Sequence, residues 1–243
     1  MIEQASAFVT GGIGALAVVM ALIFLVIDHR VFVRREGGGP PTWKVAAGVG
    51  GWMTLTALAA ASGILRRYDA VPPPLMVLMV MSVSSGVMLG LSPVGTRWVE
   101  AAPLAWVVGL MTFRLPLEIV MEEAAQSLVM PYQLSFRGFN FDIFTACMAL
   151  LVAPLLARGW ATSRLVWVWN AVGWVTLSVI GVLAILLSPM VHFFGQEPDQ
   201  VNTWVTYFPF VWLPSVLVSL ALFGHVVVTR KLLREGQPPP ATP

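Results

Sequence analysis

The sequence predicts an all-α protein, a polytopic bundle of seven transmembrane helices. Hydrophobic residues make up 58% of the 243 residues and charged residues only 11%, whereas a soluble domain carries about 25% charged residues. The mean hydropathy is +0.82, which excludes a soluble globular fold. The charged residues lie mostly between long uncharged stretches, and each such stretch is a candidate membrane span.

Seven stretches are candidates, because a helix needs roughly 20 apolar residues to cross a hydrocarbon layer about 30 Å thick. In chain order they cover 4–27, 45–65, 70–96, 98–113, 143–157, 165–191 and 200–228. The fifth is short and needs neighbouring residues to cross. We expect residues 1–235 to form one transmembrane domain and residues 236–243 to form a flexible, Pro-rich cytoplasmic tail.

The distribution of basic residues predicts the orientation, because cytoplasmic loops carry an excess of Lys and Arg. Of the 14 basic residues, ten fall on the side that we assign to the cytoplasm and four on the other. The N-terminus is therefore expected outside and the C-terminus inside. The cytoplasmic set is Arg30, Arg34, Arg35, Lys44, Arg97, Arg158, Arg164, Arg230, Lys231 and Arg234; the outer set is Arg66, Arg67, Arg114 and Arg137.

Several classes of chemistry lack their signatures in this sequence. Cys147 is the only cysteine, so neither a disulfide within the chain nor a cysteine cage for a metal can form. No metalloprotease, nucleophile-elbow or phosphate-loop motif is present. Lys44 and Lys231, the only lysines, both lie at cytoplasmic edges, which excludes a retinal Schiff base. We expect no metal and no nucleic-acid partner.

The three histidines are poorly placed to act together. His29 and His225 lie near the cytoplasmic ends of the first and seventh predicted helices, and His192 lies outside. Haem bound between His29 and His225 is geometrically conceivable, but nothing else in the sequence supports it. No cofactor is therefore predicted.

A stripe of polar residues interrupts the apolar pattern at the end of the fourth stretch. Arg114, Glu118, Glu122 and Gln126 follow one another at four-residue intervals, so on a helix they share one face. Arg114 is expected within the hydrocarbon, close to its outer boundary, where an Arg needs a partner. Glu118 is the nearest candidate partner, and Asp142 is the best remote one.

This stripe has two interpretations. In the first, Arg114 forms the floor of a polar pocket that opens to the outer side and binds a ligand. In the second, Arg114 reaches outward to the membrane surface and residues 118–131 lie along that surface as an interfacial helix. The sequence leaves both open.

Three further polar residues are candidates for the same ligand site. Asn140 and Asp142 open the fifth helix, where either could be an N-cap instead. Asn170 lies within the hydrocarbon on the sixth helix, where a hydrogen bond to another helix is the alternative to ligand binding. The candidate ligand-binding residues are Arg114, Glu118, Glu122, Asn140, Asp142 and Asn170.

Small residues at helical spacing predict two faces where helices pack closely, since lipid provides no hydrophobic drive for helices to associate. One lies on the third helix and one on the second. Their members are Ser82, Gly86 and Gly90, and Gly50, Thr54, Ala57 and Ala61, respectively.

Four short sequence patterns lie between Arg114 and about Arg230. They are Arg-x-Pro at Arg114 and Pro116, Asp-Ile at Asp142, Trp-Asn-x-x-Gly at Trp169, and the paired prolines Pro209 and Pro214. This half of the chain resembles a broad group of small uncharacterised bacterial polytopic membrane proteins, from which the acidic Glu122–Glu123 pair departs. The resemblance implies bacterial origin and topology, and no activity.

The sequence predicts a multi-pass protein of a bacterial cytoplasmic (inner) membrane and leaves three classes of function open. The first is a transporter or sensor that binds a small molecule or lipid in the polar pocket. The second is a non-catalytic membrane subunit or scaffold that packs against a partner protein or a second copy. The third is a membrane enzyme, which has the least support because no nucleophile with a matching base is apparent.

Overall fold

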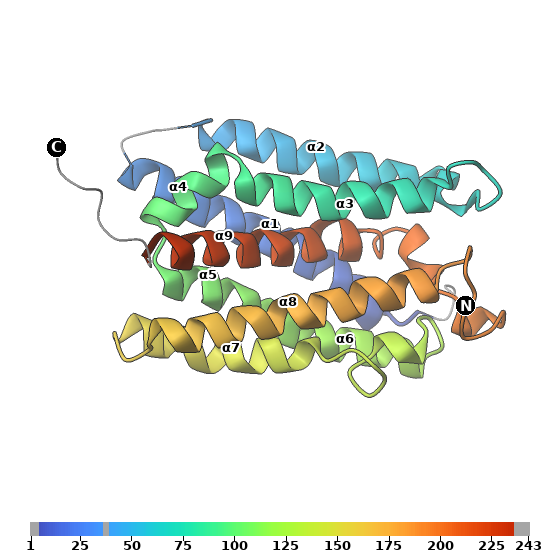
Figure 1. The fold of residues 1–243 in the computed structure, drawn as a ribbon. Coiled ribbons are helices and arrows are strands. Elements are labelled where there is room, and N and C mark those ends of the chain that lie inside the picture. Colours follow the sequence, from blue (N-terminus) through green and yellow to red (C-terminus); the bar gives the residue numbers. More distant parts are fainter. Residues whose placement is uncertain (1–4, 36–38, 236–243) are drawn as a thin grey trace.

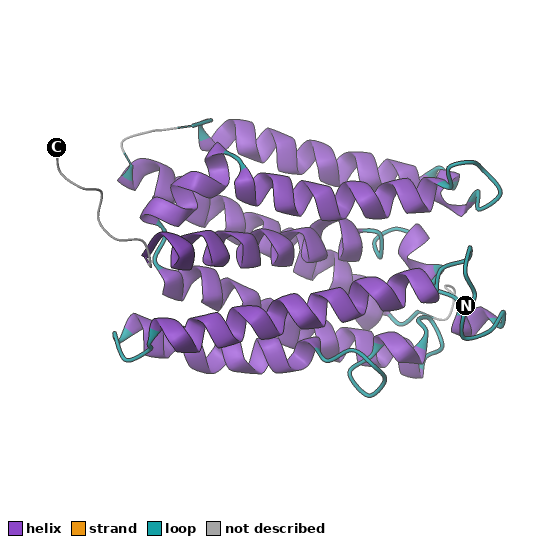
Figure 2. Cartoon of the chain, viewed as in Figure 1, coloured by secondary structure: helices purple, strands orange, loops and turns teal. Residues whose placement is uncertain are grey.

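A computed structural model describes residues 5–35 and 39–235. Within these ranges the chain forms helices joined by turns and no strand, and the long helices run side by side in one bundle (Figures 1 and 2). The prediction of an all-α bundle is confirmed. The predicted Pro-rich tail, 236–243, lies outside the described residues.

Nine α-helices are present in the described residues. They are α1 (Ala7–Arg34), α2 (Thr42–Ala61), α3 (Pro74–Leu91), α4 (Pro93–Ala101), α5 (Leu104–Leu110), α6 (Arg114–Gln126), α7 (Asp142–Ala157), α8 (Ser163–Leu186) and α9 (Ser219–Glu235). A 3₁₀ turn, Met111–Phe113, joins α5 to α6. A π-helical turn, Leu213–Val218, leads directly into α9.

Five helical stretches in the described residues are long and apolar enough to cross a membrane. They are α1, α3, Leu104–Gln126 (α5 to α6), α8 and Leu213–Glu235 (the π-helical turn with α9). The shorter apolar α7 packs on α8, and α2 packs on α1 at the edge of the bundle (Figure 1). The protein is thus a multi-pass helical membrane protein, and membrane crossing by α2 and α7 stays a prediction.

Several predicted helix boundaries differ from the structure. The fourth stretch, 98–113, is divided between α4 and α5, because Ala102 adopts an extended conformation before Pro103. The third stretch ends at Leu91 because Ser92 adopts an extended conformation, and Ser92 then caps α4, which begins at Pro93. The last helix begins later than Gln200, since 3₁₀ turns occupy Pro198–Gln200 and Trp204–Thr206. Pro214 lacks an N–H and lies within the π-helical turn, consistent with a local break in regular α-helix.

The predicted packing face of α3 is confirmed. A Cβ built on Gly86 would lie 2.4 Å from the carbonyl oxygen of Ser219, and one on Gly90 would lie 2.7 Å from Val226 Cγ1. Ser219 Oγ also donates a hydrogen bond to the carbonyl oxygen of Ser82 at 2.8 Å. The backbones of α3 and α9 therefore approach closely because these residues are small.

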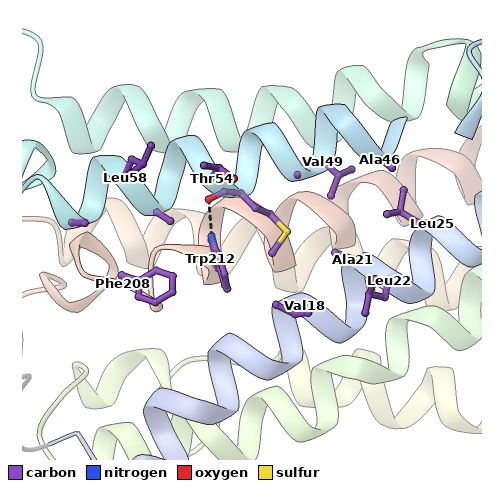
Figure 3. A pocket seen from close by; sticks show the side chains of 14 residues that line it. Val18, Ala21, Leu22, Leu25, Ala46, Val49, Thr54, Leu58, Phe208 and Trp212 are labelled. Atoms are coloured by element: carbon purple, nitrogen blue, oxygen red, sulfur yellow. Dashed lines mark hydrogen bonds between the residues drawn. The ribbon is translucent and has the colours of Figure 1, made fainter. Parts of the chain in front are cut away.

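No helix among the described residues packs closely against the predicted face of α2. Its four small residues instead line a groove of about 650 Å³ between α1, α2 and the segment that carries Phe208 and Trp212 (Figure 3). One wall is fixed by Trp212, whose Nε1 donates to the carbonyl oxygen of Met53 at 3.0 Å (Figure 3). The prediction of a helix contact through this face was therefore wrong for contacts within the chain.

Arg97 is buried in α4 and does not lie in a cytoplasmic loop. Its Nε donates to Asp28 Oδ1 at 3.0 Å, its Nη2 pairs with Asp28 Oδ2, and its Nη1 donates to the carbonyl oxygen of Pro40. Trp98 Nε1 donates to the same Asp28 at 2.9 Å. This ion pair joins α1 to α4, and sequence analysis missed it because Asp28 and Arg97 lie on separate helices.

Candidate functional site

Three of the four residues in the polar stripe of α6 face the interior of the bundle, and the fourth, Gln126, is exposed. Arg114 is the first residue of α6, and its exposed fraction is 1%; Glu118 and Glu122, one and two turns later, are also buried. Because α6 continues α5 up to Gln126, residues 118–126 do not lie along the membrane surface as a separate helix. The interpretation in which Arg114 reaches out to the membrane surface was therefore wrong.

Arg114 is paired with Asp142. The Nη1 of Arg114 lies 2.8 Å from Oδ1 of Asp142, the first residue of α7. Thr176 on α8 donates to the same oxygen at 2.9 Å. The remote partner suggested by the sequence is thus the direct one, whereas Glu118, the nearer candidate, makes no hydrogen bond to Arg114.

Glu118 is instead bonded to Asn140. The Nδ2 of Asn140 donates to Glu118 Oε1 at 2.7 Å and to the carbonyl oxygen of Leu134 at 3.1 Å. The Oδ1 of Asn140 accepts from the backbone N–H of Asp142 at 2.9 Å, a capping-type bond at the start of α7. Asn140 therefore lies one residue before Phe141, the N-cap of α7, and ligand binding by Asn140 stays a prediction.

The segment Ser127–Phe141 lies over these polar residues, at the end of the bundle that is predicted to face outward. Arg137 Nε lies 3.2 Å from Glu122 Oε1, and the exposed fraction of the Arg137 side chain is 61%. Tyr132 Oη donates to the carbonyl oxygen of Arg137 at 2.7 Å, which ties the two sides of this segment together. The polar residues that were expected to line a pocket open to the outer side are therefore buried in this structure.

The inner part of the cluster is built around His225, which sequence analysis left out of the site. Its ring is fully buried and stacked on Trp169, with ring centroids 4.9 Å apart. His225 Nδ1 lies 2.8 Å from Asn170 Oδ1, and Asn170 Nδ2 donates to Thr229 Oγ1 at 2.7 Å. Asn170 thus bridges α8 and α9, as one of its two interpretations predicted.

Gly173 makes the close approach of His225 possible. A Cβ built on Gly173 would lie 2.0 Å from Cε1 of the His225 ring, so no side chain larger than hydrogen fits there. Together with Trp169 and Asn170, all three named residues of the Trp-Asn-x-x-Gly pattern surround His225. The pattern marks this face of α8, but it does not identify the histidine that α9 places against it.

Hydrogen bonds and the stacking of Trp169 on His225 connect the two parts of the site, and Glu122 lies beside Glu118 on α6. Trp169 Nε1 donates to the carbonyl oxygen of Thr145 at 3.0 Å, and the hydroxyls of Thr145 and Thr176 lie 2.9 Å apart. Thr176 in turn bonds to Asp142. We call this connected set the polar cluster: Arg114, Glu118, Glu122, Asn140, Asp142, Thr145, Asn170, Thr176 and His225.

Five buried atoms of the polar cluster have no hydrogen-bond partner among the described residues. They are Arg114 Nε and Nη2, Glu118 Oε2, Glu122 Oε2 and His225 Nε2. Buried polar atoms are nearly always bonded to protein or ordered water, because an unmade bond costs about 1–3 kcal/mol. A group of such atoms in one place is suited to receive another hydrogen-bonding molecule.

Metal binding is not suggested by this arrangement. In the described part of the chain, no group of three or more His, Cys, Asp and Glu side chains is arranged to hold a metal ion. Neither a family model, nor a curated protein, nor a solved structure matches the chain. The interpretation of the site therefore depends on its geometry.

Replacing Arg114 tests whether its charge is buried and compensated. Arg114→Ala leaves Asp142 without its ion-pair partner, which we expect to lower the free energy of unfolding by about 3–5 kcal/mol. Arg114→Lys restores only part of the loss, because Lys lacks the planar fork of donors. Thermal unfolding in mild detergent measures both.

Arg137→Ala is the matched control, since this Arg pairs with Glu122 from an exposed position, where ion pairs contribute about 0–1 kcal/mol. Equal losses in Arg114→Ala and Arg137→Ala would contradict the assignment.

Gly173→Ala tests the close contact with His225. The added methyl group displaces the His225 ring, and we expect a loss of about 1–3 kcal/mol from overpacking. Gly181→Ala on the same helix is the control: nothing lies within 4 Å of its Cβ position, so the better helix propensity of Ala stabilises by up to about 1 kcal/mol. The same thermal unfolding measurement tests both variants. An unchanged free energy of unfolding for Gly173→Ala would show that the close contact with His225 is wrong.

Proposed function

We propose that this multi-pass membrane protein is a transporter or sensor that binds a small polar molecule in the polar cluster. The observation that carries the proposal is the set of unpartnered donors and acceptors on Arg114, Glu118 and His225. Charged side chains inside a membrane are costly, and those that are retained usually mark a ligand or ion pathway.

The chemistry of Arg114 indicates the kind of group it binds. Its Nη1 is held by Asp142, which leaves Nε and Nη2, two donors on one edge of the guanidinium. This edge matches the two oxygens of a carboxylate or phosphate group. Glu118 Oε2 offers an acceptor on the same helix face, so the best fit is a small solute that carries both an acidic group and an N–H or O–H donor.

The orientation proposed from the basic residues places the covering segment Ser127–Phe141 on the outer side. α1 ends with Arg34 and α9 ends after Arg234, and both helices end at the same end of the bundle, opposite the N-terminus (Figure 1). We propose seven membrane crossings with this basic end in the cytoplasm of a bacterial cell. Solute then reaches the polar cluster from outside by displacement of the covering segment.

A second candidate function, a non-catalytic subunit, is favoured by the groove beside α2. Its wall of Gly50, Thr54, Ala57 and Ala61 is the kind of surface against which another transmembrane helix packs (Figure 3). In this alternative the partner is a membrane protein or a second copy of the chain, and the polar cluster only joins helices.

Co-purification separates the two functions. The protein is purified in mild detergent, and bound small molecules are extracted and identified by mass spectrometry. We expect one acidic solute in stoichiometric amount, retained by Arg137→Lys. Arg114→Lys should reduce it about tenfold or more, since a hydrogen bond to a charged group contributes about 1.5–3 kcal/mol.

Equal solute content in Arg114→Lys and Arg137→Lys, or no solute above background in the unmodified protein, would contradict a binding role. A co-purifying polypeptide without solute would support the subunit alternative.

A further inference from the structure

We propose that the polar cluster also exchanges protons, with Glu118 and His225 as the two groups that bind and release them on either side of the Arg114–Asp142 pair. This inference rests on the proposed function and adds the proton as a second species that the same cluster binds and conducts. Chains of Asp, Glu and His side chains inside a helix bundle are a recurring route for protons.

Glu118 is suited to this role because the cluster holds more acidic than basic groups. Arg114, the Arg of the polar cluster, is bonded to Asp142, and Glu118 receives a single hydrogen bond, from Asn140. An isolated buried carboxylate is costly in a medium of low dielectric constant. A proton on Glu118 Oε2 removes that charge and turns the unpartnered oxygen into a donor.

The other charged groups around Glu118 do not offset the excess of acidic groups in the polar cluster. Glu122 lies one turn away, and its Oε1 is held by Arg137 and by Gln126 Nε2. α1 also packs on α6, and the contact between them is apolar where Gly12 of α1 lies against Val120 of α6. No cation among the described residues is bonded to Glu118.

Glu122 connects Glu118 to the end of the bundle predicted to face outward. The two side chains lie on one face of α6, one turn of about 5.4 Å apart. Glu122 Oε2 has no partner among the described residues, and its other oxygen contacts the exposed Arg137. A proton that enters beside Arg137 can therefore pass from one carboxyl group to the next.

The hydrogen bonds of His225 determine which of its nitrogens is free to accept. Thr229 Oγ1 donates to the carbonyl oxygen of His225 and so accepts from Asn170 Nδ2. Asn170 Oδ1 therefore faces His225 Nδ1 as an acceptor, and Nδ1 carries the ring proton. Nε2 is left with a lone pair and no partner among the described residues, which makes it the proton-accepting atom.

The surroundings of His225 hold its ring in place, and no acidic side chain among the described residues is bonded to it. α8 faces it with the uncharged Trp169, Asn170 and Trp174. Arg114 is the charged side chain that acts on it electrostatically. The nearest charges on its own helix are directed elsewhere, since Arg230 bonds to Gly90 and Thr96 and Lys231 bonds to the carbonyl oxygens of Val99 and Ala102.

The charged residues of α4, which also packs on α9, are paired with other groups. Arg97 is bound to Asp28, and Glu100 is bound to Arg35 and Arg234.

In the proton transfer, the O–H bond at Glu118 Oε2 breaks, an N–H bond forms at His225 Nε2, and no electron is transferred. Solute or water between the two groups carries the proton.

Proton flux into liposomes tests the inference. The purified full-length protein is reconstituted into liposomes that contain a pH-sensitive dye, and a potassium diffusion potential set by valinomycin drives protons inward. We expect acidification faster than in protein-free liposomes, reduced to the protein-free rate by Glu118→Gln and by His225→Gln. Glu118→Asp, which keeps a carboxyl group, should retain part of the flux and guards against misfolding of the amide variant.

Glu123→Gln and His29→Gln are the matched controls, since they make the same chemical changes at side chains outside the polar cluster, and both should keep the full rate. A protein-free rate for the unmodified chain, or a full rate for Glu118→Gln, would overturn the inference.

Solute content, measured on the same preparations, separates this inference from the proposed function. Stoichiometric solute with no proton flux removes the proton step and keeps solute binding. Proton flux that depends on Glu118 and His225 in a chain without solute supports the proton step and removes the solute-binding function.

Discussion

The Arg114–Asp142 ion pair is the interaction on which the arrangement of α6, α7 and α8 depends. Each partner is the first residue of its helix, so the pair fixes where α6 and α7 meet, and Thr176 attaches α8 to the same carboxylate. Within a membrane an unpaired charge at this position would be far more costly than in water. Both charges therefore have to be present together. The segment Ser127–Phe141, which joins α6 to α7 and includes Asn140, then has to fold back over the polar cluster.

Polar pairs and small residues, rather than apolar burial, position the remaining helices. Lipid is as apolar as the helices it surrounds, so apolar contacts alone do not favour one arrangement of a bundle over another. Asp28 and Arg97 join α1 to α4 at one end, and Gly86 and Gly90 let α9 lie against α3. The face of α2 that has no such partner within the chain is the one that remains open as a groove (Figure 3).

The sequence predicted what depends on spacing along one helix, and missed what depends on which helices are neighbours. The four-residue interval of Arg114, Glu118 and Glu122 predicts a shared face, and the cost of a membrane charge predicts a partner such as Asp142. His225 was missed because periodicity places it on α9 without showing that α8 brings Trp169, Asn170 and Gly173 around it. The enclosure of the site depends on side chains of an irregular segment, such as Arg137 and Asn140, for which helical periodicity gives no rule.

A double-mutant cycle on Arg114 and Asp142 is the most direct measurement of this account. The free energy of unfolding in mild detergent is measured for the unmodified chain, for Arg114→Ala, for Asp142→Ala and for the double variant. A buried, hydrogen-bonded pair predicts a double variant less destabilised than the sum of the two single variants, with a coupling energy of about 1.5–3 kcal/mol. Additive effects of the two substitutions would show that Arg114 and Asp142 do not stabilise the bundle as a pair, and would contradict the account.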